Sequence, residues 1–291
     1  MNAVVSNETV VQARGLRKRY GSLQALDGID LSIPQGRIVG LIGRNGAGKT
    51  TALKAMLGLT SFEGDLSVLG HNPYRDRERL MQEVTYVADV AVLPKWMRVS
   101  QAVDFVAHCH PRFSTEMAMA SLAKTDIKQR SKVKELSKGM IVQLHLALVM
   151  AIDARFLVLD EPTLGLDVVY RKMFYQSLLN DYFDGTRTIL VTTHQVEEIE
   201  HIVTDVVFIE RGRIVFNESI ESLGEKYVEV LAGKDQADAA RRLSPLSERR
   251  EFGQTVFLFE RDARKGLEAL GDMRRPRLAD LFVAKVTGGM Q

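Results

Sequence analysis

Short apolar segments separated by turn residues fill the first part of the chain and predict strands at 9–13, 26–33 and 37–42. The third segment, IVGLI, leads directly into the glycine-rich stretch GRNGAGKT. The following TALKAMLGL has a helical composition that ends at Gly58, and another strand is expected at 64–69. This order indicates a glycine-rich loop held between a strand and a helix.

The apolar pattern changes at about Val90, and up to about Ala151 the residues are polar and helical in composition. Two short apolar runs follow, at 156–159 and 188–192, each between helical stretches. Such runs are typical of strands that are buried on both faces. The pattern therefore predicts an α/β fold with a parallel sheet between layers of helices.

Residues after Ser219 have a third pattern. KYVEVLA and TVFLFE predict strands, ADAARRL and RKGLEAL predict helices, and PRLADLFVAKV predicts a last helix. We therefore expect a large domain at 1–220, with a helical subdomain at about 90–151, and a small α+β extension at 221–291.

The composition of the 291 residues narrows the class of protein. Hydrophobic residues make up 45% and charged residues 26%, as in soluble globular proteins, and the formal net charge of +2 gives no reason to expect a nucleic-acid partner. The only cysteine, Cys109, excludes an intrachain disulfide. No apolar run reaches the ~18 residues that a membrane-spanning helix needs, so a function at a membrane would require a partner that spans it.

The glycine-rich stretch matches the phosphate-binding pattern G-x-x-x-x-G-K-[ST] at every position. Its glycines let backbone N–H groups turn towards an anion, and the helix that begins there adds the positive end of its dipole. Lys49 is expected to reach the β- and γ-phosphates of a nucleotide, and Thr50 to offer its hydroxyl to Mg²⁺. The candidate phosphate-binding residues are Gly43, Asn45, Gly46, Ala47, Gly48, Lys49, Thr50 and Thr51.

Two acidic residues, Asp160 and Glu161, follow the apolar run FLVL. In an open α/β sheet, the carboxyl end of such a strand lies beside the phosphates. Asp160 is therefore a candidate Mg²⁺ ligand, and Glu161 is a candidate base that orients or deprotonates a water for attack on the γ-phosphate. His194 follows the strand predicted at 188–192 and is expected at the same edge, in contact with the γ-phosphate or the attacking water.

The order of these motifs over residues 10–220 resembles the ATP-binding subunits of ABC transporters. The resemblance implies a P-loop NTPase fold that combines a RecA-like core, an antiparallel β-subdomain and the helical subdomain. It also implies ATP and Mg²⁺ as cofactors and ATP hydrolysis as the activity, with Glu161, His194 and Lys49 as catalytic residues. Tyr20, in RKRYGSLQALDGIDLSI, occupies the place of the aromatic residue that stacks on adenine in this family.

The segment LSKGM, at 136–140, resembles the LSGGQ signature of the same family. The resemblance implies that the Ser137 hydroxyl and the Gly139 backbone N–H bind the γ-phosphate held by a partner subunit. A lysine and a methionine replace the family's first glycine and its glutamine. In the segment TLGLD, Asp167 matches the aspartate that lies across the dimer interface.

One position departs further from the family pattern. Members usually carry glutamine after a motif like GYLP, where it contacts Mg²⁺ and the attacking water, whereas the segment TYVAD has Asp89 there. This shorter, charged side chain is expected to reach Mg²⁺ through water. The candidate metal ligands are therefore Thr50, Asp160 and Asp89.

The resemblance also implies partners. Each site would combine the motifs of one chain with Ser137, Gly139 and Asp167 of a second ATPase subunit, either a copy or a paralogue, so that two chains meet head to tail around two MgATP. A multi-span membrane permease would receive the motion and would hold this cytoplasmic chain at the inner face of the cell membrane. The segment RPRLADLFVAKVTGG resembles the C-terminal extensions of ABC-2-type exporter ATPases, which favours export.

The stretch VAVLPKWMRVSQAVDFV contains the only tryptophan, Trp96. In the family this region forms the groove for a coupling helix of the membrane subunit, and an exposed apolar groove is a reasonable docking site. The alternative is that Trp96 belongs to the core of the helical subdomain. The sequence leaves both alternatives open.

Two other functions also use a P-loop. Soluble ABC-type ATPases that act on ribosomes or DNA usually have two nucleotide domains in one chain or a long coiled-coil insertion, and the sequence contains neither feature. A P-loop GTPase needs a guanine-reading N-K-x-D element after the later strands, and this element is also missing. The sequence therefore favours a subunit that powers transport.

Overall fold

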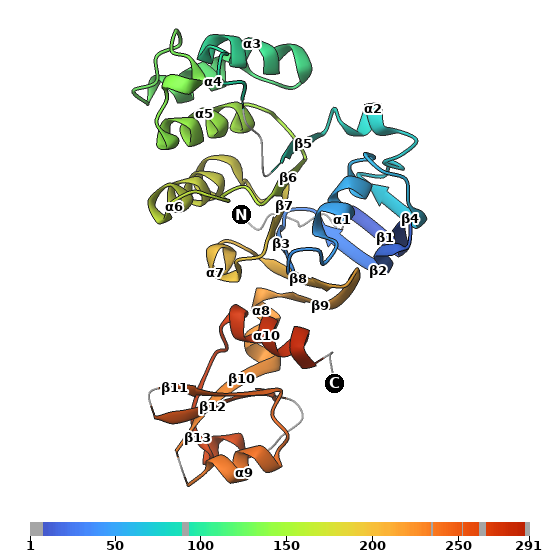
Figure 1. Cartoon of the computed structure of the whole chain (residues 1–291), viewed down its shortest axis with the longest axis vertical. Coiled ribbons are helices and arrows are strands. Elements are labelled where there is room, and N and C mark those ends of the chain that lie inside the picture. The colour runs from blue at the N-terminus through green and yellow to red at the C-terminus, as the bar shows by residue number, and fades with distance from the viewer. Residues whose placement is uncertain (1–7, 89–92, 234, 252, 262–265, 289–291) are drawn as a thin grey trace.

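The structure, a computed structural model, describes residues 8–88, 93–233, 235–251, 253–261 and 266–288 (Figure 1). Its central element is a six-stranded sheet in the order β5-β6-β7-β3-β8-β9. The strands from β5 to β8 are parallel, and β9 pairs antiparallel with β8 at one edge. The expected parallel sheet is therefore confirmed. Its strands are β3 (Ile38–Ile42), β5 (Val84–Val87), β6 (Phe156–Asp160), β7 (Thr188–Thr193), β8 (Asp205–Glu210) and β9 (Arg213–Ser219).

Both faces of this sheet are covered because its strands send apolar side chains into two cores. In β3, Val39 and Leu41 belong to one core, whereas Ile38 and Ile42 belong to the other. Helix α1 (Lys49–Met56) and a three-stranded antiparallel sheet close the first core. The second core is closed by α6 (Val168–Ser177), a π-helical turn (Leu178–Tyr182), α7 (Val196–Ile199) and α10 (Leu278–Gly288).

The antiparallel sheet has the order β2-β1-β4 and contains longer strands than the apolar pattern predicts. The strand predicted at 9–13 continues to Tyr20, because the chain passes a register shift beside Gly15, whose φ is 56°. A bulge of this kind lets a strand continue although the apolar alternation is broken. The three strands are β1 (Thr9–Tyr20), β2 (Leu23–Pro34) and β4 (Glu63–Val68), and the short helix α2 (Arg77–Leu80) follows them.

A separate group of helices lies at the top of Figure 1. It has a core of its own, which includes Val99, Val103 and Leu144. Trp96 is 68% exposed, so the alternative that it belongs to this core is wrong. The subdomain boundaries at about 90–151 stay a prediction. The described elements are α3 (Val99–Cys109), α4 (Thr115–Ala123), a 3-10 turn (Val133–Glu135) and α5 (Lys138–Met150).

The C-terminal part forms a four-stranded antiparallel sheet in the order β11-β12-β10-β13. The helix expected in RKGLEAL is wrong for its described residues, which form only a 3-10 turn (Leu267–Ala269) before β13. Gly266 and Gly271 flank this turn with φ values of 94° and 153°, outside the helical region. The domain division at residue 220 stays a prediction. The elements are α8 (Ile220–Lys226), β10 (Tyr227–Ala232), α9 (Ala237–Arg242), β11 (Ser247–Glu251), β12 (Gln254–Glu260) and β13 (Gly271–Arg274).

Candidate functional site

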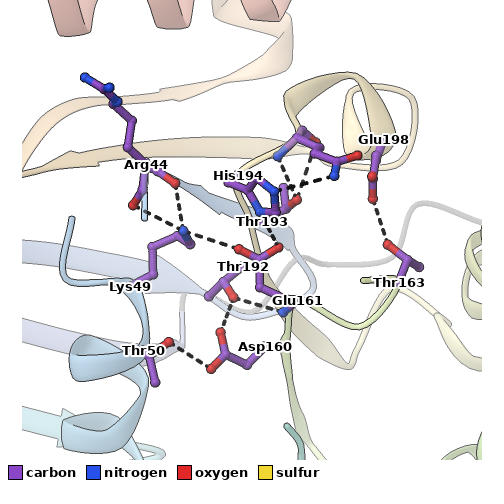
Figure 2. Close-up of polar contacts among 12 residues, drawn as sticks. Arg44, Lys49, Thr50, Asp160, Glu161, Thr163, Thr192, Thr193, His194 and Glu198 are labelled. Atoms are coloured by element: carbon purple, nitrogen blue, oxygen red, sulfur yellow. Dashed lines mark hydrogen bonds and ion pairs between the residues drawn. The ribbon is translucent and has the colours of Figure 1, made fainter. Parts of the chain in front are cut away.

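The candidate chemical groups lie at the carboxyl ends of neighbouring strands (Figure 2). The glycine-rich loop follows β3, Asp160 ends β6 with Glu161 directly after it, and His194 follows β7. Because β7 lies between β6 and β3, a single edge of the sheet gathers the loop, the acids and the histidine.

The loop after β3 has a conformation that its glycines permit. Gly48, with a φ of 113°, directly precedes the first residue of α1, Lys49. A Cβ atom at Gly43 would lie 2.5 Å from the carbonyl oxygen of Ile209, so a larger residue does not fit there. The helix therefore begins at the end of a tight loop, and its positive N-terminal end faces the space in front of the sheet.

Lys49 folds back over this loop and is only 6% exposed. Its ammonium group donates to the carbonyl oxygens of Gly43 at 2.7 Å and of Arg44 at 3.4 Å. It also lies 3.3 Å from Oε1 of Glu161. A buried ammonium group whose partners are all oxygen acceptors is suited to binding phosphate.

Asp160 is held between two hydroxyl groups and is 4% exposed. Thr50 Oγ1 donates to Oδ2 of Asp160 at 3.1 Å, and Thr192 Oγ1 donates to Oδ1 at 2.5 Å. Thr192 was not predicted as a site residue from the sequence, although it belongs to the TILVTT strand that precedes His194.

The Thr50 hydroxyl and the Asp160 carboxylate fit a magnesium ion. Both supply hard oxygen atoms, and Mg²⁺ commonly takes one or two protein oxygens and completes its shell with phosphates and water. Within the described ranges, no cluster of three or more His, Cys, Asp or Glu side chains is arranged to hold a metal ion. The remaining ligand candidate, Asp89, lies outside the described residues.

Glu161 has an unusual backbone for a residue other than glycine, with a φ of 48°. Its N–H donates to the carbonyl oxygen of Thr192 at 3.1 Å and to the Thr192 hydroxyl at 3.2 Å, which holds this conformation. Its Oε1 is 3.3 Å from Lys49 Nζ, and its Oε2 is 2.9 Å from His194 Nδ1. The strained backbone thus directs a carboxylate at the glycine-rich loop, with an imidazole beside it.

These groups open into a cavity of about 630 Å³, a volume within the range of small-molecule sites. Tyr20 lies on its wall and is 45% exposed, and the Lys18 ammonium is 5.0 Å from the centre of the Tyr20 ring. Gly43 and Ala47 are buried in the loop beside the cavity. Of the other predicted residues, Asn45, Gly46, Gly48, Thr51 and His194 line it.

Two cationic residues that the sequence analysis did not select, Arg44 and Arg211, also line this cavity. Arg211 forms the turn between β8 and β9 with a φ of 47°, and the next residue, Gly212, donates its N–H to the Ala47 carbonyl at 2.8 Å. This contact holds the turn against the glycine-rich loop. The only signal in the sequence is an Arg-Gly pair between two apolar segments that were not predicted as strands.

Ser137 and Asp167 are not among the described residues that line the cavity. Ser137 caps α5 by accepting from the N–H of Met140 at 3.2 Å. Asp167 caps α6 by accepting from the N–H groups of Val169 and Tyr170 at 3.0 and 3.1 Å. Within one chain, both residues therefore act as helix caps.

Gly139 is likewise away from the cavity lining, as far as the chain is described, and has a packing role that sequence analysis missed. It is buried on α5 against Tyr170 of α6, and a Cβ atom at this position would overlap the Tyr170 ring. The missing side chain therefore lets the two helices approach each other.

Across the ranges that the structure describes, none of the helices combines the length and the apolar composition of a membrane-spanning segment.

A protein-family model and two named bacterial proteins are similar to this chain in sequence. The family model described as ABC transporter matches residues 26–164. The Nod factor export ATP-binding protein I of Burkholderia thailandensis is 34% identical, and the match covers 94% of this chain and 95% of that protein. The ABC transporter ATP-binding protein YtrB of Bacillus subtilis is 28% identical over 76% of each chain.

A solved structure has the same fold. It is described as the ATP-binding subunit of an ABC transporter, and it superposes with a TM-score of 0.65 at 22% sequence identity. The match covers 75% of this chain and 92% of the solved one.

Proposed function

This chain belongs to the family of ABC transporter ATP-binding proteins, and we propose that it hydrolyses ATP to power export through a separate membrane permease. Its similarity to a protein named for export covers 94% of this chain and so includes part of the C-terminal extension, which supports that direction of transport.

The arrangement of cations around the cavity supports ATP as the nucleotide substrate. The cavity is lined by Lys49, Arg44 and Arg211, so a polyphosphate would meet positive charge from three residues. Lys49 would exchange its carbonyl and Glu161 partners for the β- and γ-phosphate oxygens. Tyr20 would then stack on the adenine.

The position of Glu161 is the single observation that carries the proposal of hydrolysis. Its carboxylate lies between the Lys49 ammonium group and the His194 imidazole, beside the glycine-rich loop. Release of Lys49 to the phosphates leaves Oε1 free to take a proton from the attacking water, while His194 Nδ1 holds Oε2. Catalysis of this kind consists mainly of positioning and charge stabilisation.

Thr50 and Asp160 would hold the magnesium ion. When bound, the ion neutralises charge on the β- and γ-phosphates. Thr192 keeps the Asp160 carboxylate in place through its hydroxyl, and the same hydroxyl accepts from the Glu161 N–H. The base and the metal ligand are therefore oriented by one side chain.

A second ATPase subunit, either a copy of this chain or a paralogue, would complete each site. Ser137, Gly139 and Asp167 are not among the described residues that line the cavity of their own chain, and we infer that they face the nucleotide of the other subunit. Two chains would close head to tail around two MgATP and reopen after hydrolysis.

The helical region would pass this motion to the permease at the inner face of the cell membrane. Trp96, Phe105 and Met117 are 68%, 57% and 56% exposed, so this region offers apolar side chains that a helix of the permease could cover. A soluble ATPase acting on ribosomes or DNA is the rival function, and no specific observation favours it.

Affinity purification of the tagged chain from detergent-solubilised membranes tests the proposal. We expect a multi-span membrane protein to co-purify. Trp96→Ala should reduce that co-purification while the ATPase activity of the purified ATPase without the permease stays unchanged. Tyr74→Ala, at a side chain that is 59% exposed elsewhere, is the matched control. Co-purification of ribosomes, with no membrane protein, would overturn the transport function.

A further inference from the structure

Glu198 of α7 has a buried carboxylate that takes no part in the site described above. Its side chain is 6% exposed, and Oε1 lies 2.7 Å from an Nη atom of Arg171. Oε2 accepts a hydrogen bond from Thr163 Oγ1 at 2.7 Å (Figure 2). A carboxylate buried to this degree is costly unless both oxygens are paired, so its two partners determine where it lies.

The partners of Glu198 hold the two ends of one loop, the segment 163–167. Thr163 begins it, and the Leu166 N–H donates to the Thr163 carbonyl at 3.1 Å. Arg171 donates from its other Nη atom to the Leu166 carbonyl at 3.2 Å, directly before Asp167. Glu198 therefore contacts the start of the segment directly and its end through Arg171.

The Thr163 end of the segment is buried as well as hydrogen-bonded. Thr163 is 2% exposed, and its hydroxyl lies 3.2 Å from the hydroxyl of Tyr175, which is 1% exposed. Burial raises the pKa of Tyr175, so this hydroxyl stays neutral. These four side chains, Glu198, Arg171, Thr163 and Tyr175, form one polar cluster. The negative charge of Glu198 is balanced in it by the positive charge of Arg171.

The segment 163–167 also influences which side chain of α6 packs against α5. Asp167 caps α6 through the Tyr170 N–H, and the Tyr170 ring covers Gly139. At the other end, α7 begins just after His194, which contacts Glu161. The Glu161–His194 pair is thus connected to Glu198 through the start of α7. Glu198 is in turn connected to Asp167 and Gly139 through the segment 163–167 and the Tyr170 ring.

We propose that Glu198 is a positioning residue that holds segment 163–167 in the geometry in which Asp167, Ser137 and Gly139 meet the nucleotide of a second subunit. This inference rests on the proposed function, because it assumes a site shared by two chains. Glu198 does not line the cavity as described, so its effect passes through Thr163 and Arg171.

The test uses Glu198→Gln in a Glu161→Gln protein, in which slow hydrolysis should trap the ATP-bound dimer. Glutamine keeps an acceptor for Thr163 but loses the charge that binds Arg171. We expect ATP-dependent dimerisation, measured by analytical ultracentrifugation, to weaken about 10- to 100-fold, the range for loss of a residue that orients a site group. Binding of a fluorescent ATP analogue by the single chain should be kept, because neither Glu198 nor its partners Thr163 and Arg171 line the chain's own cavity as described.

Two further variants separate positioning from a general loss of structure. Arg171→Lys keeps the charge but has a single nitrogen for Glu198 and the Leu166 carbonyl, so it should also weaken dimerisation. Glu197→Gln, on the exposed side of the same helix, is the matched control and should leave dimerisation unchanged.

Each result decides the inference. If the Glu161→Gln parent forms no ATP-dependent dimer, the proposed function is wrong and the inference falls with it. If the parent dimerises and the Glu198→Gln protein dimerises equally well, only the inference is wrong. If Glu198→Gln loses analogue binding together with dimerisation, Glu198 has a general packing role, which also overturns the inference.

Discussion

At the scale of single residues, Thr192 links the two acids of the candidate site. Replacement by valine keeps the shape but removes the donor to Asp160 and the acceptor for the Glu161 N–H. We expect Thr192→Val to lower the ATPase rate by about 10- to 100-fold, as for other residues that orient a metal ligand. Steady-state ATP hydrolysis with Mg²⁺ measures this effect.

Thr188, at the opposite end of β7, is the matched control for Thr192. Both side chains are fully buried, and the Thr188 hydroxyl accepts one hydrogen bond, from the Gly36 N–H at 3.0 Å. Thr188→Val should reduce the free energy of unfolding by about 1–3 kcal/mol, the cost of an unpaired buried group, but leave turnover unchanged. Equal ATPase rates for the two variants would show that Thr192 has only a structural role.

Gly139 is predicted to be needed for packing, apart from any contact with phosphate. The added methyl group of Gly139→Ala would overlap the Tyr170 ring, which must then shift. We expect the free energy of unfolding in urea to fall by about 1 kcal/mol, the lower end for overpacking, since the ring lies at the end of a side chain.

A second substitution should relieve this overlap. Tyr170→Ala removes the ring, so Gly139→Ala should cost little stability in that background. Gly233→Ala is the control, because among the described residues a Cβ atom there would meet no atom within 4 Å. An additive effect of Gly139→Ala and Tyr170→Ala would contradict the proposed overlap.

The site residues that were predicted from motifs can be recognised from their neighbours in the sequence. Lys49, Thr50, Asp160, Glu161 and His194 each follow a recognisable strand, and parallel strand order brings them to one edge. Arg211 and Thr192 could not be selected in the same way, because their importance comes from contacts with distant segments. Glu198 was missed for the same reason.

At the scale of elements, the C-terminal sheet depends on a buried acid, Glu229 of β10. Its side chain is inaccessible to solvent, and it accepts hydrogen bonds from Arg249 at 2.6 Å and Arg274 at 2.7 Å. Burial alone would raise the pKa of Glu229, but the two guanidinium groups outweigh it and hold that pKa below its usual value. Arg249 also lies 3.3 Å from Asp280, which ties α10 to the sheet.

This low pKa predicts how the stability of the C-terminal sheet changes with pH. Because the folded-state pKa of Glu229 lies below its unfolded value, the contribution is complete above the unfolded pKa. It is lost as the pH falls through the folded-state value. Glu229→Gln should cost about 3 kcal/mol at neutral pH and should flatten the acid limb of the stability curve.

Thermal unfolding followed by circular dichroism across the acidic range measures this dependence. Glu248→Gln is the control, since its partner Arg241 lies at the surface and the pair is screened by water. The control should change the curve much less than Glu229→Gln. Parallel curves for Glu229→Gln and the unsubstituted protein would contradict the assigned role.

Continuous apolar runs predicted β6 and β7, although the similar run VVFI of β8 was not selected. The runs FLVL and TILVT gave β6 and β7 almost at their observed bounds, because both strands are buried on both faces. β9 was missed because it is an edge strand with polar residues such as Asn217 and Glu218. The helix predicted in RKGLEAL fails because its glycine takes a positive φ.

At the scale of the whole molecule, the structure separates the two halves of the proposed catalytic site. The phosphate loop, Glu161 and His194 line one cavity, and Asp160 is bonded to Thr50 beside it. Ser137 and Asp167 cap helices and are not among the described residues that line this cavity. We therefore expect ATP hydrolysis to require two chains and nucleotide binding to require only one. This division was predicted only from the resemblance of the motifs to a known family. A site that is shared with a second chain leaves no pattern in the composition or periodicity of the sequence.

Glu161→Gln tests whether the Glu161 carboxylate is the base for ATP hydrolysis. Glutamine keeps the shape but cannot take a proton from water, so ATP turnover should fall by about 10²- to 10⁴-fold, the usual contribution of a general base. The affinity for a fluorescent ATP analogue should be kept, and light scattering should detect a dimer in MgATP. Turnover at the unsubstituted rate would remove Glu161 from the role of base and contradict the account.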